Sequence, residues 1–175
     1  MIFDLYKYPD NNRKVFEAYL VCPSLQKYLV AVETLQGSSC YSPYSSELCE
    51  VNRLIESNNL DCAHQFLLKN SCNLILSPIF HMTMAFFFNR QRQVKKMKYS
   101  YLIATNCIKG ILSSGDGTKE KPYLITRVSD EHDVLNYLGK TLTLQSLVKV
   151  EDKAYDRLQC VDKTVLWFEL RNMIN

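Results

Sequence analysis

Cysteine and histidine are the residues of this sequence best suited to metal binding or nucleophilic chemistry. Cys62 and His64 form a Cys-x-His pair, and Cys72 and His81 follow further along the chain. A zinc site needs four nitrogen or sulfur ligands with convergent geometry. On a helix, residues 62 and 64 lie about 200° apart around the axis, so they could not share a metal ion there. We therefore interpret these residues as structural or surface residues, and we expect no metal or cofactor.

An enzyme is the alternative function that these residue types leave open. A cysteine nucleophile needs an imidazole that the fold brings to it, and the chain has seven cysteines and three histidines. We find no local cysteine-protease signature and no G-x-S-x-G elbow in the sequence. The alternative is therefore a hydrolase whose site is assembled from dispersed residues. The candidates are Cys62, His64, His81 and Asp116.

A run of basic residues is the strongest charge feature of the chain. Phosphate binding would need such cations gathered on one surface. On a helix they would spread over a broad face opposite Val94 and Met97, which is typical of a solvated helix surface. RNA binding is the weaker interpretation, so we do not expect nucleic acid as a partner. The run consists of Arg90, Arg92, Lys95, Lys96 and Lys98.

Two tyrosines, Tyr41 and Tyr44, lie in a segment rich in serine and proline beside Cys40. Loop tyrosines often contact partners, because they supply a large contact area at low entropic cost. An equally good interpretation is that they anchor the loop on the helical layer, and loop position alone does not decide. Together with the basic run, they give the candidate partner-binding residues. These are Tyr41, Tyr44, Arg90, Arg92, Lys95 and Lys96.

The composition is that of an ordinary globular protein. The chain has 175 residues, of which 47% are hydrophobic and 22% charged, which suffices for one packed core. Its formal net charge of +3 is too small to indicate nucleic-acid binding by itself. No stretch approaches the roughly 20 apolar residues of a membrane span, so we expect no membrane association. The apolar run from Ile79 to Phe88 is shorter and contains His81 and Thr83, which predicts a buried helix.

The cysteines and the N-terminus bear on the cellular compartment. The number of cysteines is odd, and the sequence contains no Cys-x-x-Cys. The first residues lack an apolar region of signal-peptide length. Free, mostly buried thiols in a reducing compartment are the simplest interpretation. The sequence therefore predicts a cytoplasmic location.

Turn residues and apolar spacing divide a single domain, residues 1–175, into a helical part (about 1–113) and an α+β part (about 118–175). In layout the paired helices resemble a tetratricopeptide-type hairpin, although the repeat signature is incomplete. The predicted fold class is α+β, with an N-terminal helical-hairpin layer followed by a small, mainly antiparallel sheet with one helix. Apolar spacing predicts helices at 13–21, 25–35, 48–55, 60–70, 79–89 and about 91–112, and strands beginning at 123, 141, 154 and 163.

Residues 113–139 predict a turn, a strand and a capped helix in succession. Gly115 and Gly117 are suited to a turn, because glycine adopts positive φ without a Cβ penalty. A phosphate-binding loop would need a strand before it and a helix directly after it. Here the order is helix, loop and strand, so we interpret the glycines as a structural turn. Ser129 is expected to cap the following helix, with Asp130 in its first turn, where the helix dipole favours negative charge.

Six short motifs in the chain resemble those of a domain family of unknown function from Bacteroides and its relatives. The likeness runs from about Tyr41 to the C-terminus. It departs at His132, where the family commonly has Tyr, and at the start, where many members carry an export signal. The resemblance implies no catalytic residues. The motifs are Tyr41-Ser42-Pro43-Tyr44, Ser114-Gly115-Asp116-Gly117, Ser129-Asp130-Glu131-His132, Gln145-Ser146-Leu147, Tyr155-Asp156 and Trp167-Phe168-Glu169.

The sequence thus favours a non-enzymatic protein-binding protein over an enzyme. Helical layers present surfaces that suit protein recognition. The narrower hypothesis is an immunity protein that neutralises, in the cytoplasm, a toxin delivered between competing bacteria. The partner we expect is accordingly another protein, such as a cognate toxin.

Overall fold

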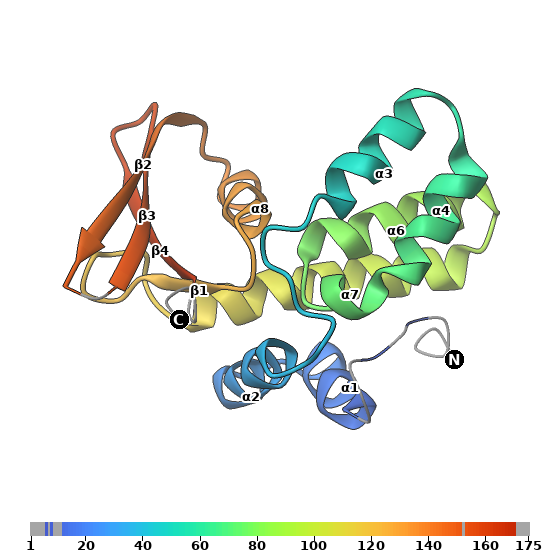
Figure 1. Ribbon diagram of the computed structural model, residues 1–175, viewed down its shortest axis with the longest axis horizontal. Helices are drawn as coiled ribbons and strands as arrows, with labels where there is room; N and C mark the ends of the chain where they lie inside the picture. Colours follow the sequence, from blue (N-terminus) through green and yellow to red (C-terminus); the bar gives the residue numbers. More distant parts are fainter. Residues whose placement is uncertain (1–5, 7, 9–11, 152, 171–175) are drawn as a thin grey trace.

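Helices occupy the first two thirds of the chain, and a small sheet occupies the last third (Figure 1). The computed structural model describes Tyr6, Tyr8, residues 12–151 and residues 153–170. The fold class is α+β, as the sequence predicts. Among the described residues, no helix has both the length and the apolar character that crossing a membrane requires. The helices are α1 (Arg13–Val21), α2 (Leu25–Gln36), α3 (Glu47–Glu56), α4 (Leu60–Lys69), α5 (Ser71–Leu74), α6 (Pro78–Arg90), α7 (Val94–Ser113) and α8 (Ser129–Tyr137).

The hairpin of α6 and α7 is the centre of the helical part. Pro78 occupies the first turn of α6, where its missing N–H is not needed. The turn between the two helices is tight, and Arg92 adopts a φ of 57° there. On the other side α7 packs closely on α1: a Cβ added at Gly110 would lie 1.8 Å from the Tyr19 hydroxyl oxygen. That hydroxyl donates to the Asn106 carbonyl at 2.8 Å, so α7 and α1 are joined by packing and by a buried hydrogen bond.

The sheet has the strand order β1-β4-β3-β2. β2 and β3 pair antiparallel, β3 and β4 pair antiparallel, and β1 pairs parallel with β4. The predicted mainly antiparallel sheet with one helix is therefore confirmed. In Figure 1 α8 lies between the sheet and the α6–α7 hairpin, so it links the two parts of the fold. The strands are β1 (Tyr123–Ile125), β2 (Leu142–Val150), β3 (Lys153–Cys160) and β4 (Val165–Leu170).

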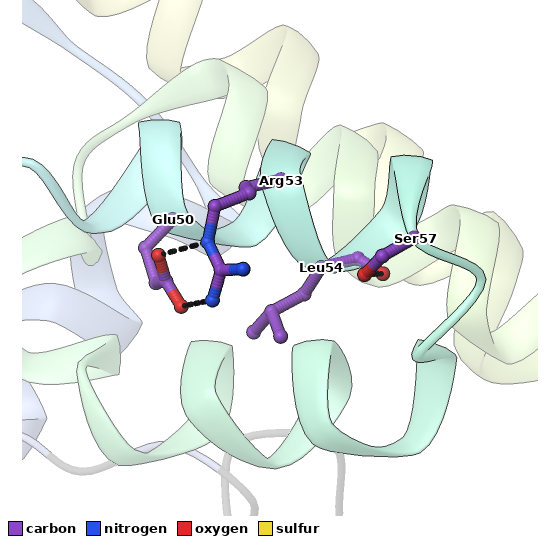
Figure 2. A network of polar contacts seen from close by, with 4 residues as sticks. All are labelled: Glu50, Arg53, Leu54 and Ser57. Atoms are coloured by element: carbon purple, nitrogen blue, oxygen red, sulfur yellow. Dashed lines mark hydrogen bonds and ion pairs between the residues drawn. The ribbon is translucent and has the colours of Figure 1, made fainter.

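The helix α3 carries a polar network on its exposed side (Figure 2). The Arg53 guanidinium donates to both carboxylate oxygens of Glu50, at 2.8 and 2.6 Å. At the end of the helix the Leu54 carbonyl accepts from the Asn59 backbone N–H at 2.8 Å and from the Ser57 hydroxyl at 3.1 Å. The Glu50–Arg53 pair thus lies within α3, and the contacts of the Leu54 carbonyl lie at its end, just before the turn to α4.

The prediction of free, mostly buried thiols is wrong. Cys40 and Cys72 form a disulfide, with their Cα atoms 6.2 Å apart. The short helix α5, which the sequence did not predict, places Cys72 beside the loop that carries Cys40. Of the free cysteines, Cys22, Cys49 and Cys62 are exposed, and only Cys107 and Cys160 are buried. Because disulfides persist in oxidising compartments, the thiols no longer argue for a cytoplasmic location, which stays a prediction.

The predicted cap of α8 is also wrong. Val128 is the N-cap residue, and no side chain caps the helix. The Asp130 carboxylate instead turns back and accepts from the backbone N–H groups of Thr126 at 3.0 Å and Arg127 at 3.2 Å. It is fully buried, so this acidic residue stabilises the chain before the helix rather than the solvated first turn that the sequence suggests.

Candidate functional site

The outward face of α6 is apolar although it is not covered by other elements. Ile79, Met82, Thr83 and Phe86 follow one another at steps of three, one and three residues, so they lie on one face of the helix. Met82 is 47% exposed and Phe86 is 38% exposed. The opposite face is buried in the core, as the sequence predicts, but the prediction of a buried helix is wrong for this outward face.

Neighbouring helices turn this face into a groove. One hollow of about 270 Å³ lies where α6 meets α7 and α8, and another of about 230 Å³ lies between α6 and α3. Ile79 and Met82 line both hollows, which therefore lie next to each other along this face of α6. We call this feature the α6 groove, and its main apolar lining residues are Ile55, Ile79, Met82, Phe86, Ile108 and Tyr137.

One end of the α6 groove lies against α8 and is marked by Asp133. The Asp133 carboxylate accepts the backbone N–H of Ile79 at 3.0 Å. Burial, and then the charge of Asp130, raise the pKa of Asp133 to about 7. This carboxyl is thus only partly ionised at neutral pH, and it fixes the first turn of α6 to α8.

The other end of the groove is basic. The Arg90 guanidinium lies 5.9 Å from the centre of the Phe86 ring, whereas the Lys96 ammonium lies on another side of α6, 5.5 Å from the centre of the buried Phe88 ring. Within residues 12–151 and 153–170, no ion pair involves the basic run of the sequence. We call this cationic cluster the hairpin tip. It consists of Arg90, Arg92, Lys95, Lys96 and Lys98.

A polar cleft of about 410 Å³ adjoins the hairpin tip at the α3–α4 turn. His64 lies in it and stacks on Phe87, with ring centres 4.9 Å apart. Gln91 contacts the His64 ring nitrogen Nδ1 at 3.3 Å, and Asp61 and Arg90 also line the cleft. Burial lowers the pKa of His64, so the imidazole is neutral at pH 7 and the charge of this cleft comes from Asp61 and Arg90.

The residues of the enzymatic alternative do not meet. Cys62 is exposed on α4. His81 is fully buried, its Nε2 lies 2.8 Å from the Ile75 carbonyl oxygen, and burial lowers its pKa to about 4. Asp116 lies in the loop after α7, where it accepts from the N–H and hydroxyl of Thr118 at 3.0 and 2.7 Å. Each of these groups serves its own part of the fold, and in the described part of the chain no group of His, Cys, Asp and Glu residues is placed to hold a metal ion.

Tyr41 and Tyr44 lie away from the hairpin tip. The Tyr41 hydroxyl donates to the Thr126 carbonyl at 2.8 Å, which is the geometry of an anchor. Tyr44 is 62% exposed, and its raised pKa reflects desolvation first and then the charge of Asp156 on β3. In Figure 1 the sheet and the hairpin tip lie on opposite sides of the molecule, so the candidate tyrosines and cations do not form one surface.

A buried polar network under α8 is the feature that sequence reasoning missed. The Asn73 side chain accepts from the Ser42 N–H at 2.9 Å and donates to the Ser45 hydroxyl at 2.8 Å. The Asn73 carbonyl accepts from Arg127 at 3.0 Å. Arg127 and Asp130 are both buried, and burial raises the pKa of Asp130 to about 6. The only sequence signal was the presence of charged residues next to an apolar strand.

These features define an α+β protein with an apolar groove on its helical side. We compared the chain with models of protein families, with curated proteins and with solved structures, and none of them matches it. Family membership therefore stays a prediction from the short motifs.

Proposed function

We propose that this chain is a non-enzymatic protein-binding protein whose partner occupies the α6 groove. The observation that carries the proposal is the exposure of Met82 and Phe86 on the apolar face of α6, beside two adjacent hollows. Soluble proteins rarely leave large apolar patches uncovered, and such patches mark interaction sites. Covering the two side chains with a partner would remove this apolar surface from water.

The residue types of the groove also suit an interface. Interfaces are enriched in Phe, Tyr, Met and Arg, with an apolar centre and a polar rim. Here Met82 and Phe86 form the centre, Tyr137 lies on one wall, and Arg90 stacks over Phe86 at the rim. The arrangement predicts that Met82 and Phe86 contribute most of the binding energy.

In its narrower form, the proposal is that the partner is a toxin delivered between competing bacteria, which this chain neutralises in the cytoplasm. The support is the motif resemblance to the Bacteroides family together with a groove that could cover a functional surface of another protein. Because the hairpin tip is cationic, we expect an acidic partner surface rather than a basic nuclease. Co-expression tests this form: the chain should restore growth to cells that express the partner, and continued killing would contradict it.

The general proposal is tested by affinity purification from the native host. The tagged wild-type chain is compared with a Met82→Glu/Phe86→Glu double variant and with Leu144→Glu, which changes a 55%-exposed apolar residue on β2. We expect a stoichiometric partner with the wild type and Leu144→Glu, and its loss with the double variant. Circular dichroism of the three purified proteins serves as the control that each of them folds. A partner that all three retain, or no partner at all, would overturn the proposal.

A further inference from the structure

The walls of the α6 groove restrict what kind of chain segment can lie in it. The groove is lined by residues of α3, α6, α7 and α8, whose backbone N–H and C=O groups are used within the helices. No strand edge is present in this lining, so an extended peptide would find no backbone partners there. A segment that satisfies its own backbone groups, which means a helix, avoids this cost.

The length of the apolar face matches about three helical turns. Ile79 and Arg90 are eleven residues apart in one helix, which corresponds to roughly 16 Å at 1.5 Å per residue. A helix lying along α6 would place apolar residues at i, i+3 or i+4, and i+7 against Ile79, Met82 and Phe86. It would pack at the usual interaxial distance of about 8–10 Å.

The charges at the two ends of the α6 groove determine the direction in which such a helix lies along α6. The hairpin tip gathers five basic residues at the C-terminal end of α6, while Asp133 lies at the other end. Acidic residues are therefore stabilised over the hairpin tip and disfavoured near Asp133. The negative end of a helix dipole, its C-terminus, also prefers the cationic end.

We infer that the occupant of the α6 groove is an amphipathic α-helix of another protein, oriented parallel to α6, with acidic residues in its last turn over the hairpin tip. The inference rests on the proposed function and specifies the partner element of the same site. The partner is recognised by an apolar stripe of about three turns and by carboxylates placed next to Arg90 and Lys95.

The test is a selection from a phage-displayed library of 16-residue peptides that favour helix, against the full-length chain. We expect the selected peptides to share apolar residues at i, i+3 or i+4, and i+7, followed by Asp or Glu in the last turn. Synthetic copies are then measured by fluorescence anisotropy. Selected peptides with no such pattern, or no selected peptides, would overturn the inference.

Variants test the orientation and the charges. Met82→Glu should weaken binding of a selected peptide roughly tenfold or more, as loss of a central interface contact does. Arg90→Glu/Lys95→Glu should weaken it about three- to tenfold at low salt and less at high salt. Moving the acidic residues of the peptide from its last turn to its first should weaken binding to the wild type. Leu144→Glu and Lys149→Glu, at two exposed positions of β2, are the matched controls and should change nothing.

Failure of this inference is distinguishable from failure of the proposed function. Suppose that binding of the native partner depends on Met82 and Phe86, but the library yields no helical consensus. This result would contradict only the inference that the occupant is a helix, and the proposed function would stand. Selected peptides that bind Met82→Glu as tightly as the wild type would contradict the groove as their site. Peptides with a helical, acidic consensus whose binding depends on Met82 and Arg90 would support both the α6 groove as the binding site and the helix as its occupant.

Discussion

Glu131 is the residue whose environment differs most from what its type suggests. Its side chain is fully buried, and Gln145 donates to its Oε2 at 3.0 Å. Burial, followed by the charge and the hydrogen bond of Asp156, raises the pKa of Glu131 to about 9. The side chain is therefore a neutral acid at pH 7, held between α8 and the inner face of the sheet.

This protonation makes stability depend on pH. In the unfolded chain a glutamate ionises near its ordinary pKa of about 4.3, whereas in the folded chain Glu131 keeps its proton up to about pH 9. The folded state then binds more protons than the unfolded state, so the free energy of unfolding falls as pH rises through this window. Asp130 and Asp133, with pKa values raised to about 6 and 7, add to the decrease at its lower end.

Glu131→Gln, which keeps a neutral side chain of similar shape, should flatten this dependence between pH 7 and 9. Urea unfolding of both proteins at several pH values measures the slope. We expect the free energy of unfolding of the wild type to fall relative to that of the variant as pH rises. Parallel curves would show that Glu131 is ionised in the folded protein.

Gly110 shows how closely the helices pack. Alanine normally favours a helix over glycine by about 1 kcal/mol. At this position the added Cβ would lie within 2.7 Å of Tyr19 and Tyr28 atoms, and relieving the overlap must displace two buried rings. Gly110→Ala should therefore lower the free energy of unfolding by about 1–3 kcal/mol, as overpacking does. Chemical denaturation measures it, and a stabilised variant would mean that α1 and α2 pack more loosely on α7 than described.

At the scale of elements, the segment between α2 and α3 is held by several different contacts. The disulfide joins Cys40 to α5, Tyr41 bonds the Thr126 carbonyl, and Asn73 bonds the backbone of Ser42. A connection of this length is usually among the more mobile parts of a protein. Here it is fixed to both the helical part and the segment after β1, and it connects the two parts of the fold.

Loss of the disulfide should destabilise this connection. The bond closes a loop with a sequence separation of 32, for which loop-closure entropy predicts about 3–4 kcal/mol of stabilisation. Cys40→Ser/Cys72→Ser should lose roughly this amount, and reductant should have the same effect on the wild type. Cys49→Ser, an exposed free cysteine, is the control. If the double variant unfolded at the same denaturant concentration as the wild type, the disulfide would not contribute to stability.

Sequence patterns predict elements well and burial less well. The predicted helices at 79–89 and about 91–112 lie close to the observed α6 and α7, because the turn residues that bound them act on the local backbone. The four-residue α5 is too short to show a period, so its role in placing Cys72 could not be foreseen. The run containing Met82 and Phe86 is apolar except for His81 and Thr83, and only the placement of α3, α7 and α8 decides which side stays exposed. The burial of Glu131 depends on contacts with the sheet that follows, so it could not be predicted from its place at the start of a helix.

At the scale of the whole molecule, charge is separated along the α6–α7 hairpin. The cations of the hairpin tip lie at one end, and Asp130 and Asp133, whose pKa values of about 6 and 7 leave them at least partly ionised at pH 7, lie with α8 at the other (Figure 1). A net charge of only +3 hides this asymmetry. Since complementary fields speed and orient association, the separation predicts that a partner arrives with its acidic end toward the hairpin tip.

We propose above all that the α6 groove binds a partner protein. The most direct measurement is the dissociation constant of the purified native partner for the wild type, for Met82→Glu and for the control Leu144→Glu, by isothermal titration calorimetry. We expect at least roughly tenfold weaker binding for Met82→Glu and an unchanged value for Leu144→Glu. Equal dissociation constants for all three proteins would show that the partner binds elsewhere and would contradict the claim.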